Sequence, residues 1–335
     1  MDNKRFEIIT RNTVEVLTED DLNNLLKSKK QLSAYLGIAT TGPFHMGYLI
    51  PMCKLLDFSK AGIKNKILIA DVHSALDDLK SRWEELDKKV EYYKKCIELS
   101  FPWDDKPIFV RGSDFQLGKN YQMDVLKMST ISTISRATRA ASEVTRMKNP
   151  KVSELIYPIM QTLDEEYLKV DIQLGGIDQR HIMAFAREYL PQLSYKQRVE
   201  IMTPLVVSLK GPGVKMSASM PETCIKVYES EETIRDKINK AYCPSGISKD
   251  NPVLQLTKYV IFPIRGTLKI ERNKKFGGDI VYNAYSEIEN DFCEKNLHPQ
   301  DLKNAVSNEI VSMFSKVRKY FENKKDLLKS LGENY

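Results

Sequence analysis

Apolar runs alternate with helical spacings in the first third of the chain. Residues 66–71 form a short apolar run that ends in an acid, and residues 107–112 form another that ends in glycine. Such runs are typical of strands buried in a parallel sheet. Between them, Leu86, Val90 and Tyr93 recur at the spacing of one helical face. The order strand, helix, strand predicts an α/β fold with a parallel sheet and right-handed crossovers.

Three further segments extend this pattern. Residues 121–147 contain neither glycine nor proline and place apolar side chains on one face, which predicts one long helix, or two, inserted between sheet elements. Residues 171–176 are expected to form a strand that ends in a glycine pair. Residues 203–209 are predicted to be the last strand, directly before a glycine-rich loop at 210–213.

The character of the chain changes after about Pro221. From Glu231 onward the pattern is mostly helical, and basic residues slightly outnumber acidic ones. A sustained apolar stripe predicts packed helices near the end of the chain: Leu302, Val306, Ile310, Phe314, Val317 and Phe321. These observations predict a separate helical domain of modest positive charge.

Composition narrows the class of protein. A length of 335 residues suggests two domains, and 51 basic against 45 acidic residues give a net charge of +6, which fits an anionic partner without requiring one. Five widely spaced cysteines without a Cys-x-x-Cys pair disfavour both zinc and a disulfide framework, and so favour a reducing compartment. Neither a membrane-length apolar run nor a targeting pattern is evident, so we expect a cytoplasmic protein with no membrane partner.

Two loops carry candidate chemistry. The first, residues 37–48, follows the strand-like residues 33–36 at a place where α/β sheets bind nucleotides. It contains Gly42 and Gly47, which permit close approach, and His45, which could donate to a phosphate. Taken alone, a histidine beside a turn is more often structural.

The second loop follows the glycine-rich residues 211–213. Lys215, Ser217 and Ser219 could close over a triphosphate, with the lysine as a point charge. The alternative is a solvated surface turn. The segment lacks the glycine–lysine–hydroxyl ending of a Walker A loop.

Together, His-x-Gly at 45–47 and Lys-Met-Ser-x-Ser at 215–219 match the two ATP-binding motifs of class I aminoacyl-tRNA synthetases. The chain resembles the tyrosyl-tRNA synthetases of the archaeal and eukaryotic branch from about Thr10 to about Lys319. Family-specific blocks recur in order at residues 39–42, 69–73, 157–161, 166–171, 175–180, 275–278 and 298–306. Two positions depart from the motifs. Tyr48 stands where a second histidine is frequent, and Ala218 replaces the middle lysine or serine, which leaves Lys215 as the only motif lysine.

The resemblance implies a Rossmann-like doubly wound parallel sheet with inserted helices, followed by an α-helical domain. The catalytic domain would span residues 1–222, with dimerisation helices at about 115–160 and a mobile Lys-Met-Ser loop at about 210–222. Residues 223–335 would form the anticodon-binding domain. A homodimer is expected.

The resemblance also assigns a tyrosine pocket. Tyr35 and Asp164 match the residues that hold the phenol, while Tyr157, Gln161 and Gln179 match the grip on the ammonium and carboxylate end. A buried phenol needs both a donor and an acceptor, so such a pocket rejects phenylalanine and no editing domain is required. The role of His73 stays open between a pocket wall and packing.

The remaining site residues are implied in the same way. ATP would contact Thr40, Gly42, His45, Gly47, Gly176, Asp178 and Lys215; His45, Lys215, Ser217 and Ser219 would face its phosphates as the catalytic residues. Transfer RNA would meet Arg180 at the acceptor stem, and Phe276 and Asp301 at the anticodon. Arg136, Arg139, Arg146 and Lys148 either meet RNA phosphates or form a solvated face. Mg²⁺ would arrive with ATP, with no protein metal site.

The implied reaction is activation of L-tyrosine by ATP to tyrosyl-adenylate and pyrophosphate, followed by transfer of tyrosine to the 3′-terminal ribose of tRNA(Tyr). One alternative is the tryptophan-specific sister enzyme, against which Tyr35, Asp164 and Gln179 argue. Another is a catalytically silent RNA-binding paralogue, against which the intact ATP motifs argue. A different adenylate-forming or nucleotidyl-transfer enzyme would lack the helical tail.

Overall fold

The computed structural model describes residues 2–28, 31–77, 80–144, 151–216 and 220–332, which divide into two compact units. Unit 1 contains Met1–Gly42, Asp57–Lys94 and Trp103–Leu205, and unit 2 contains Pro43–Leu56, Lys95–Pro102 and Val206–Tyr335. The two units are therefore interleaved along the sequence, whereas the expected domains meet at a single boundary at residue 222.

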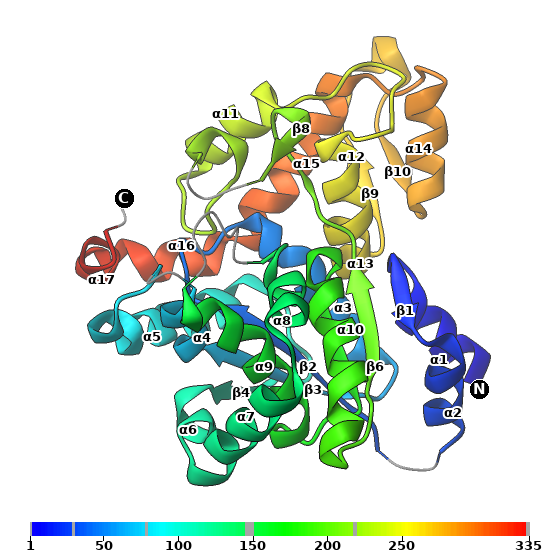
Figure 1. Cartoon of the computed structure of the whole chain (residues 1–335). Helices are drawn as coiled ribbons and strands as arrows, with labels where there is room; N and C mark the ends of the chain where they lie inside the picture. Colours follow the sequence, from blue (N-terminus) through cyan, green and yellow to red (C-terminus); the bar gives the residue numbers. More distant parts are fainter. Residues whose placement is uncertain (1, 29–30, 78–79, 145–150, 217–219, 333–335) are drawn as a thin grey trace. The chain divides into compact units, whose positions relative to one another are not determined.

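Unit 1 is built on a six-stranded sheet with the strand order β1-β6-β5-β2-β3-β4 (Figure 1). The strands are β1 (Glu15–Leu17), β2 (Ser33–Ala39), β3 (Lys64–Ala70), β4 (Ile108–Arg111), β5 (Ile172–Gly176) and β6 (Val199–Thr203). Neighbours pair in parallel except β1, which runs antiparallel on the edge beside β6. The chain order reverses between β2 and β5, and in open α/β sheets ligands bind beside the carboxyl ends of strands at such a reversal.

Helices surround this sheet. They are α1 (Asp2–Thr10), α2 (Glu19–Lys27), α4 (Asp71–Leu76), α6 (Ser113–Gln116), α7 (Lys119–Ile131), α8 (Ile134–Ala141), α9 (Val152–Tyr167) and α10 (Arg180–Tyr189). The boundary between the units passes through α3 (Leu49–Lys60) and α5 (Leu86–Ser100). Helices α7, α8 and α10 all pack against α9, the helix that carries the predicted tyrosine residues.

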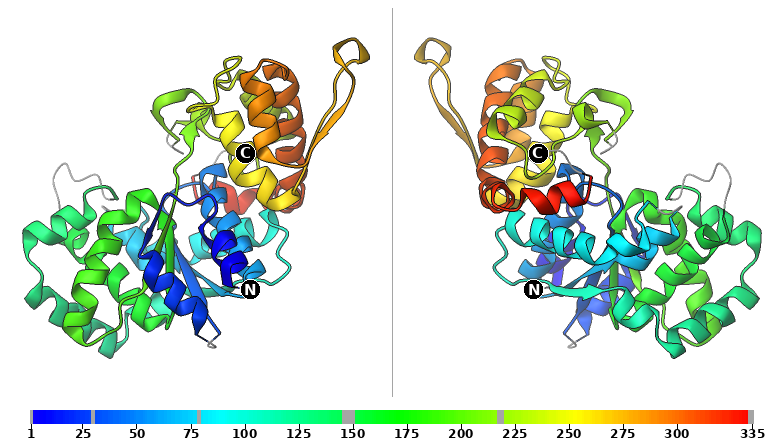
Figure 2. Two further views of the ribbon diagram at one scale, coloured as in Figure 1. Left: turned by 90° about the vertical axis from the view of Figure 1, so that its right-hand side faces the viewer. Right: turned by 90° about the vertical axis from the view of Figure 1, so that its left-hand side faces the viewer.

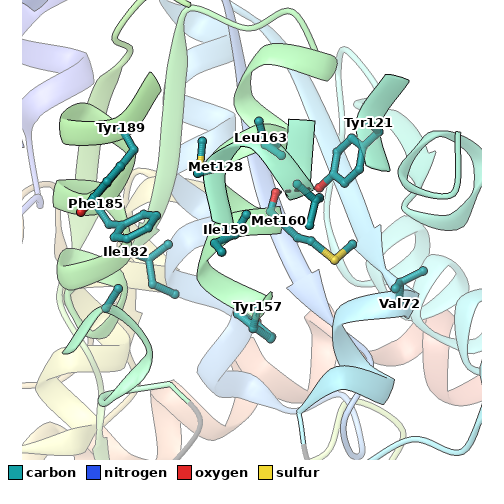
Figure 3. Close-up of a cluster of buried hydrophobic side chains, with 12 residues drawn as sticks. Val72, Tyr121, Met128, Tyr157, Ile159, Met160, Leu163, Ile182, Phe185 and Tyr189 are labelled. Carbon is teal, nitrogen blue, oxygen red and sulfur yellow. Dashed lines mark hydrogen bonds between the residues drawn. The ribbon is translucent and has the colours of Figure 1, made fainter. Parts of the chain in front are cut away.

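A buried apolar cluster fixes α9 in place. Figure 3 shows Ile159, Met160 and Leu163 of α9 between Tyr121 of α7 and Phe185 of α10. All five side chains are at most 4% exposed. Because interiors are close-packed, this contact set leaves α9 little freedom to rotate, and its polar face is held in one direction.

Unit 2 is mainly helical. It contains η1 (Met46–Tyr48), η5 (Pro221–Thr223), α11 (Glu231–Lys240), α12 (Pro252–Leu256), η6 (Thr257–Ile261), α13 (Phe262–Arg265), η7 (Lys274–Phe276), α14 (Tyr285–Cys293), α15 (Pro299–Met313), α16 (Ser315–Glu322) and α17 (Lys325–Ser330). Helix α11 packs on α15. The hairpin of β9 (Leu268–Ile270) and β10 (Ile280–Tyr282) extends away from these helices (Figure 2).

Most element predictions are confirmed. The strands expected at 66–71, 107–112 and 171–176 correspond to β3, β4 and β5, with α5 between the first two. The apolar stripe from Leu302 to Phe321 is buried along α15 and α16. The segment expected to form one helix or two forms α7 and α8, because the hydroxyl of Thr133 accepts from the Arg136 amide and begins a new helix.

Three expectations are wrong in detail. Residues 203–209 do not form one strand, because Pro204 has no amide to donate and β6 ends at Thr203. The next residues form β7 (Val207–Ser208), which pairs with β8 (Gly211–Lys215), so the expected glycine-rich loop is largely a strand. The strand after residue 33 also extends to Ala39, and it is the second strand of the chain because β1 precedes it.

Candidate active site

The predicted phenol end of the pocket centres on Asp164 in α9, whose side chain is buried. Its Oδ1 atom lies 2.8 Å from both Nε2 of Gln116 and the hydroxyl of Tyr121. Its Oδ2 atom lies 3.7 Å from Nε2 of His73. Among the described residues, neither Oδ2 of Asp164 nor Nε2 of His73 has a hydrogen-bond partner. A buried acceptor and a buried ring nitrogen are thus left to a ligand, since such groups are otherwise paired.

Tyr35, the other predicted phenol residue, is 1% exposed on β2. Its hydroxyl lies 3.4 Å from the main-chain carbonyl oxygen of Gln161, one turn before Asp164 in α9. The charge of Asp164 contributes to raising the Tyr35 pKa, behind burial and the charge of Glu165. The structure therefore brings Tyr35 and Asp164 into the same buried region of unit 1.

Burial sets the protonation of this region. It raises the pKa of Asp164 to about 8, against the opposing hydrogen bonds from Gln116 and Tyr121. Burial also lowers the pKa of His73 to about 4, against Asp71 and the Tyr157 carbonyl. Near neutral pH both side chains are therefore mainly uncharged in the unliganded protein. His73 also lies edge-on to the Tyr157 ring, with 4.6 Å between the ring centres, so it is packed among the predicted pocket residues.

The predicted ammonium and carboxylate end lies on the same helix. Tyr157, Gln161 and Asp164 all belong to α9, as the sequence spacing indicated. Nε2 of Gln161 donates to Oε1 of Gln179 at 3.1 Å, and Gln179 belongs to η3 (Ile177–Gln179), directly after β5. Two amides from separate elements thus meet beside the carboxyl end of β5.

Four of the predicted ATP residues belong to unit 1. The Thr40 amide and hydroxyl lie 2.6 and 3.0 Å from the Ser74 hydroxyl, and the Gly42 carbonyl accepts from Tyr93 at 2.7 Å. A Cβ atom on Gly176 would lie 2.5 Å from Oδ1 of Asp178. Any larger residue there would have to displace the Asp178 carboxylate, so glycine keeps the backbone open next to it.

His45 and Gly47 belong to unit 2 and depend on each other. Nδ1 of His45 accepts from the Gly47 amide at 3.1 Å, and a Cβ atom on Gly47 would lie 2.7 Å from the imidazole. Burial lowers the pKa of His45 to about 4, so the ring is neutral and Nε2 carries its hydrogen. Tyr48 occupies the position where a second histidine is frequent. It stacks on Phe44 with ring centres 4.8 Å apart, so it packs against its neighbour.

The second motif is only partly described. The backbone of Lys215 ends β8. Ser217 and Ser219 lie outside the described residues, as do Arg146 and Lys148.

The predicted RNA contacts are spread over both units. Arg180 is exposed and forms two bonds to the Glu15 carboxylate, at 2.6 and 2.8 Å. Phe276 is 63% exposed in η7, with the Lys275 ammonium 4.7 Å from its ring centre. Asp301 lies in the first turn of α15. Among the other cations, Arg136 pairs with Glu188, whereas Arg139 is exposed.

Sequence reasoning missed three polar residues of this region: Gln116, Tyr121 and Gln173. Tyr121 was assigned to an apolar helix face, and Gln116 was given no role. Gln173 is 2% exposed between Ile172 and Leu174 of β5. A glutamine inside an otherwise apolar run was the available signal, because a buried amide must find partners.

The described residues contain no group of three or more His, Cys, Asp or Glu side chains that could hold a metal ion. No helix in the described ranges is both long and apolar enough to cross a membrane.

Comparison with known proteins identifies the family. A family model described as tRNA synthetases class I (W and Y) matches residues 27–315. The tyrosine–tRNA ligase of Methanosarcina mazei is 43% identical over 94% of this chain and 98% of its own length. The cytoplasmic tyrosine–tRNA ligase of Danio rerio is 42% identical over 95% of this chain, but this chain spans only 61% of that protein.

Among solved structures, a tyrosyl-tRNA synthetase from Archaeoglobus fulgidus, complexed with L-tyrosine, superposes with a TM-score of 0.91. It is 41% identical in sequence, and the match covers 95% of this chain and 99% of that one. The chain therefore belongs to the class I tRNA synthetase family of the tryptophan and tyrosine enzymes, and within it to the branch of archaeal and eukaryotic tyrosyl-tRNA synthetases.

Proposed function

We propose that this chain is a tyrosine–tRNA ligase. It activates L-tyrosine with ATP to tyrosyl-adenylate and pyrophosphate, and then transfers tyrosine to the 3′-terminal ribose of tRNA(Tyr). One observation carries the choice of tyrosine: the buried Asp164 carboxyl is bonded on one oxygen, while the described part of the chain offers no partner to its other oxygen or to Nε2 of His73. The relative from Archaeoglobus fulgidus was solved with L-tyrosine bound.

Selection for tyrosine follows from Oδ2 of Asp164 and Nε2 of His73, the two buried atoms without a partner among the described residues. A phenol hydroxyl entering the pocket can bond Oδ2 of Asp164 and the hydroxyl of Tyr35, whereas phenylalanine can make neither bond. A site built to hydrogen-bond a substrate hydroxyl discriminates strongly against the analogue that lacks it, and tyrosyl-tRNA synthetases are the standard example of this effect. Gln161, Gln179 and Tyr157 would hold the ammonium and carboxylate of the same substrate.

The chemistry needs no nucleophile from the protein. The tyrosine carboxylate, already ionised, attacks the α-phosphorus of MgATP in line, and pyrophosphate leaves. The protein contributes orientation and charge stabilisation. We propose that Gly47 accommodates the adenine ring and that Asp178 binds the ribose hydroxyls. Thr40, Gly42 and Gly176 keep backbone close to the nucleotide. His45, Lys215, Ser217 and Ser219 face the phosphates, with Lys215 as the motif's single cation.

The RNA partner is proposed to be tRNA(Tyr). Arg180 would contact the acceptor stem, and the exposed ring of Phe276 would stack on an anticodon base that Asp301 recognises by accepting a hydrogen bond. In this assignment residues 1–222 act as the catalytic domain and residues 223–335 as the anticodon-binding domain. A cytoplasmic location is proposed as well, and it is supported by the Danio rerio relative, a cytoplasmic tyrosine–tRNA ligase.

A homodimer is also proposed. Four large apolar side chains in or beside α6, α7, α8 and α9 are 62–76% exposed: Leu117, Leu126, Ile134 and Val152. They lie in the stretch where dimerisation helices were expected. Large apolar side chains exposed to solvent favour burial against a partner. Sedimentation of the chain at micromolar concentration, compared with an Ile134→Glu variant, tests this assignment.

The activity is tested by amino-acid-dependent ATP–pyrophosphate exchange across the twenty amino acids. We expect exchange with tyrosine and with none of the others. Exchange with tryptophan instead would support the sister specificity. An inert chain that still binds tRNA(Tyr) would support a catalytically silent RNA-binding paralogue.

A further inference from the structure

A row of buried polar side chains crosses the centre of the main sheet, behind the predicted tyrosine pocket. Tyr35 on β2 is the register neighbour of Gln173 on β5, and Gln173 is the register neighbour of Glu200 on β6. All three are at most 2% exposed. Parallel strands in the middle of such a sheet are normally apolar on both faces, so three adjacent polar residues require an explanation.

Gln173 connects the row, because its amide can form hydrogen bonds to both of its neighbours, Tyr35 and Glu200. In the orientation that satisfies both ends of its amide, the nitrogen donates to Oε1 of Glu165 at 2.5 Å and to Oε2 of Glu200 at 3.1 Å. Its oxygen then accepts from the Tyr35 hydroxyl at 3.0 Å and from Nε2 of Gln161 at 3.1 Å. The opposite orientation would point the amide oxygen at two carboxyl groups and its nitrogen at two donors.

The two acids share this buried space. Glu165 and Glu200 are both buried, and burial raises the pKa of each. Two neighbouring carboxyl groups in a dry interior cannot both be ionised, so the pair keeps at least one proton at neutral pH. Arg187 and Arg198 approach from the surrounding elements, but their guanidinium groups are already bonded to Asp21 and Glu166, respectively.

The orientation of Gln173 extends to the residues assigned to substrate. Nε2 of Gln161 donates both to Gln173 and to Oε1 of Gln179. The side-chain oxygen of Gln161 is then the end of its amide that is available to a substrate ammonium. Likewise the single hydroxyl hydrogen of Tyr35 is used on Gln173 at 3.0 Å rather than on the more distant Gln161 carbonyl at 3.4 Å, so Tyr35 can only accept from a phenol. The donor to the phenol oxygen must come from the Asp164 and His73 side of the pocket.

We propose that Glu165 and Glu200 form a positioning pair which, through Gln173, fixes the donor and acceptor directions of Tyr35 and Gln161 and thereby sets the selectivity for tyrosine. This inference rests on the proposed function and deepens it. Neither acid touches substrate. Their effect is exerted through one amide whose orientation they determine.

The experiment compares three variants in tyrosine-dependent exchange: the double variant Glu165→Gln/Glu200→Gln, Gln173→Leu, and the control Glu188→Gln. The double variant keeps the side-chain volumes, but amides can donate as well as accept, so the orientation of Gln173 is no longer enforced. We expect the KM for tyrosine to rise roughly tenfold, as the loss of about one hydrogen bond in the bound state predicts. The KM for ATP should stay unchanged, and the preference for tyrosine over phenylalanine should fall.

Gln173→Leu removes the amide and should move the same quantities in the same direction, so the test survives if the double variant does not fold. Glu188 lies on α10 and pairs with Arg136 rather than with any residue of the row, and its variant should match the wild type. Unchanged tyrosine KM and selectivity in both folded test variants would overturn the positioning role while leaving the proposed function intact. A wild-type chain that shows no tyrosine-dependent exchange would overturn both.

Discussion

Asp164→Asn should stabilise the unliganded protein at neutral pH, even though it removes a residue assigned to the substrate. The cause is burial. The Asp164 carboxyl has a pKa of about 8 in the folded protein, against about 4 for an aspartate in an unfolded chain. Between these two values the folded state keeps a proton that the unfolded state has lost. Stability therefore falls as pH rises through the window from about 4 to about 8, and is level above it.

The size of the effect follows from the width of the window. Three pH units between pH 4 and pH 7, at ~1.4 kcal/mol per unit, correspond to about 4 kcal/mol. Asparagine has no proton to lose, so the unfolding free energy of the variant minus that of the wild type should increase by about this amount over the same interval. Urea unfolding followed by circular dichroism at pH 4.5, 6, 7 and 8 measures this difference.

Asp124→Asn is a matched control with the opposite sign. Burial raises the pKa of Asp124, but hydrogen bonds from Tyr195, Lys127 and Tyr167 outweigh it and the pKa is lowered overall. This variant should be less stable than the wild type at neutral pH, and its deficit should shrink as pH falls through the lowered pKa. If the Asp164→Asn difference were the same at every pH, Asp164 would be ionised in the folded protein and the reasoning from burial would be refuted.

Two further variants test the proposed roles. Lys215→Ala should reduce pyrophosphate exchange by at least about a hundredfold, the range seen when one charge-stabilising donor is lost, while tyrosine binding measured by calorimetry should be largely kept. Asp301→Ala should weaken tRNA charging and leave pyrophosphate exchange nearly unchanged, so an equal loss of both activities would contradict separate roles for the two predicted domains.

The sequence determined the scaffold because its signals are local. Apolar runs of strand length and a helical stripe located β3, β4 and β5, and the spacing of Tyr157, Gln161 and Asp164 placed them on one face of a helix. The error at residues 203–209 also has a local cause. Thr203, Val206 and Val207 favour a strand, but Pro204 ends the ladder of β6.

The partners of the site residues could not be predicted in the same way. Gln116 and Tyr121 reach Asp164 from α6 and α7, across more than forty positions of sequence. Gln173 and Glu200 become neighbours only through the register of β5 and β6. Such contacts depend on tertiary packing, and each residue alone reads as an ordinary polar side chain. The family resemblance supplied Tyr35 and Asp164, but not the network that holds them.

Tyr121→Phe tests whether that network supports the pocket. The Tyr121 hydroxyl lies 2.7 Å from the Met160 carbonyl and 2.8 Å from Oδ1 of Asp164, and its bond to Asp164 holds the pKa of that carboxyl down. Without the hydroxyl, the pKa of Asp164 should rise further, so the stability window should extend upward in pH. One lost bond of about 1–2 kcal/mol should raise the tyrosine KM roughly tenfold.

Tyr195→Phe is the control, because it removes a hydroxyl that bonds the Asp124 carboxylate at 2.5 Å but touches none of the residues assigned to tyrosine. It should lower stability and leave the tyrosine KM unchanged. If both variants lost stability but kept the wild-type KM for tyrosine, Tyr121 would be a packing residue and Asp164 would hold its position without it. If only Tyr121→Phe raised the KM, the Tyr121 hydroxyl would be part of what distinguishes tyrosine from phenylalanine. The reason is that a carboxyl can select a phenol only when its own position and protonation are fixed before the substrate arrives.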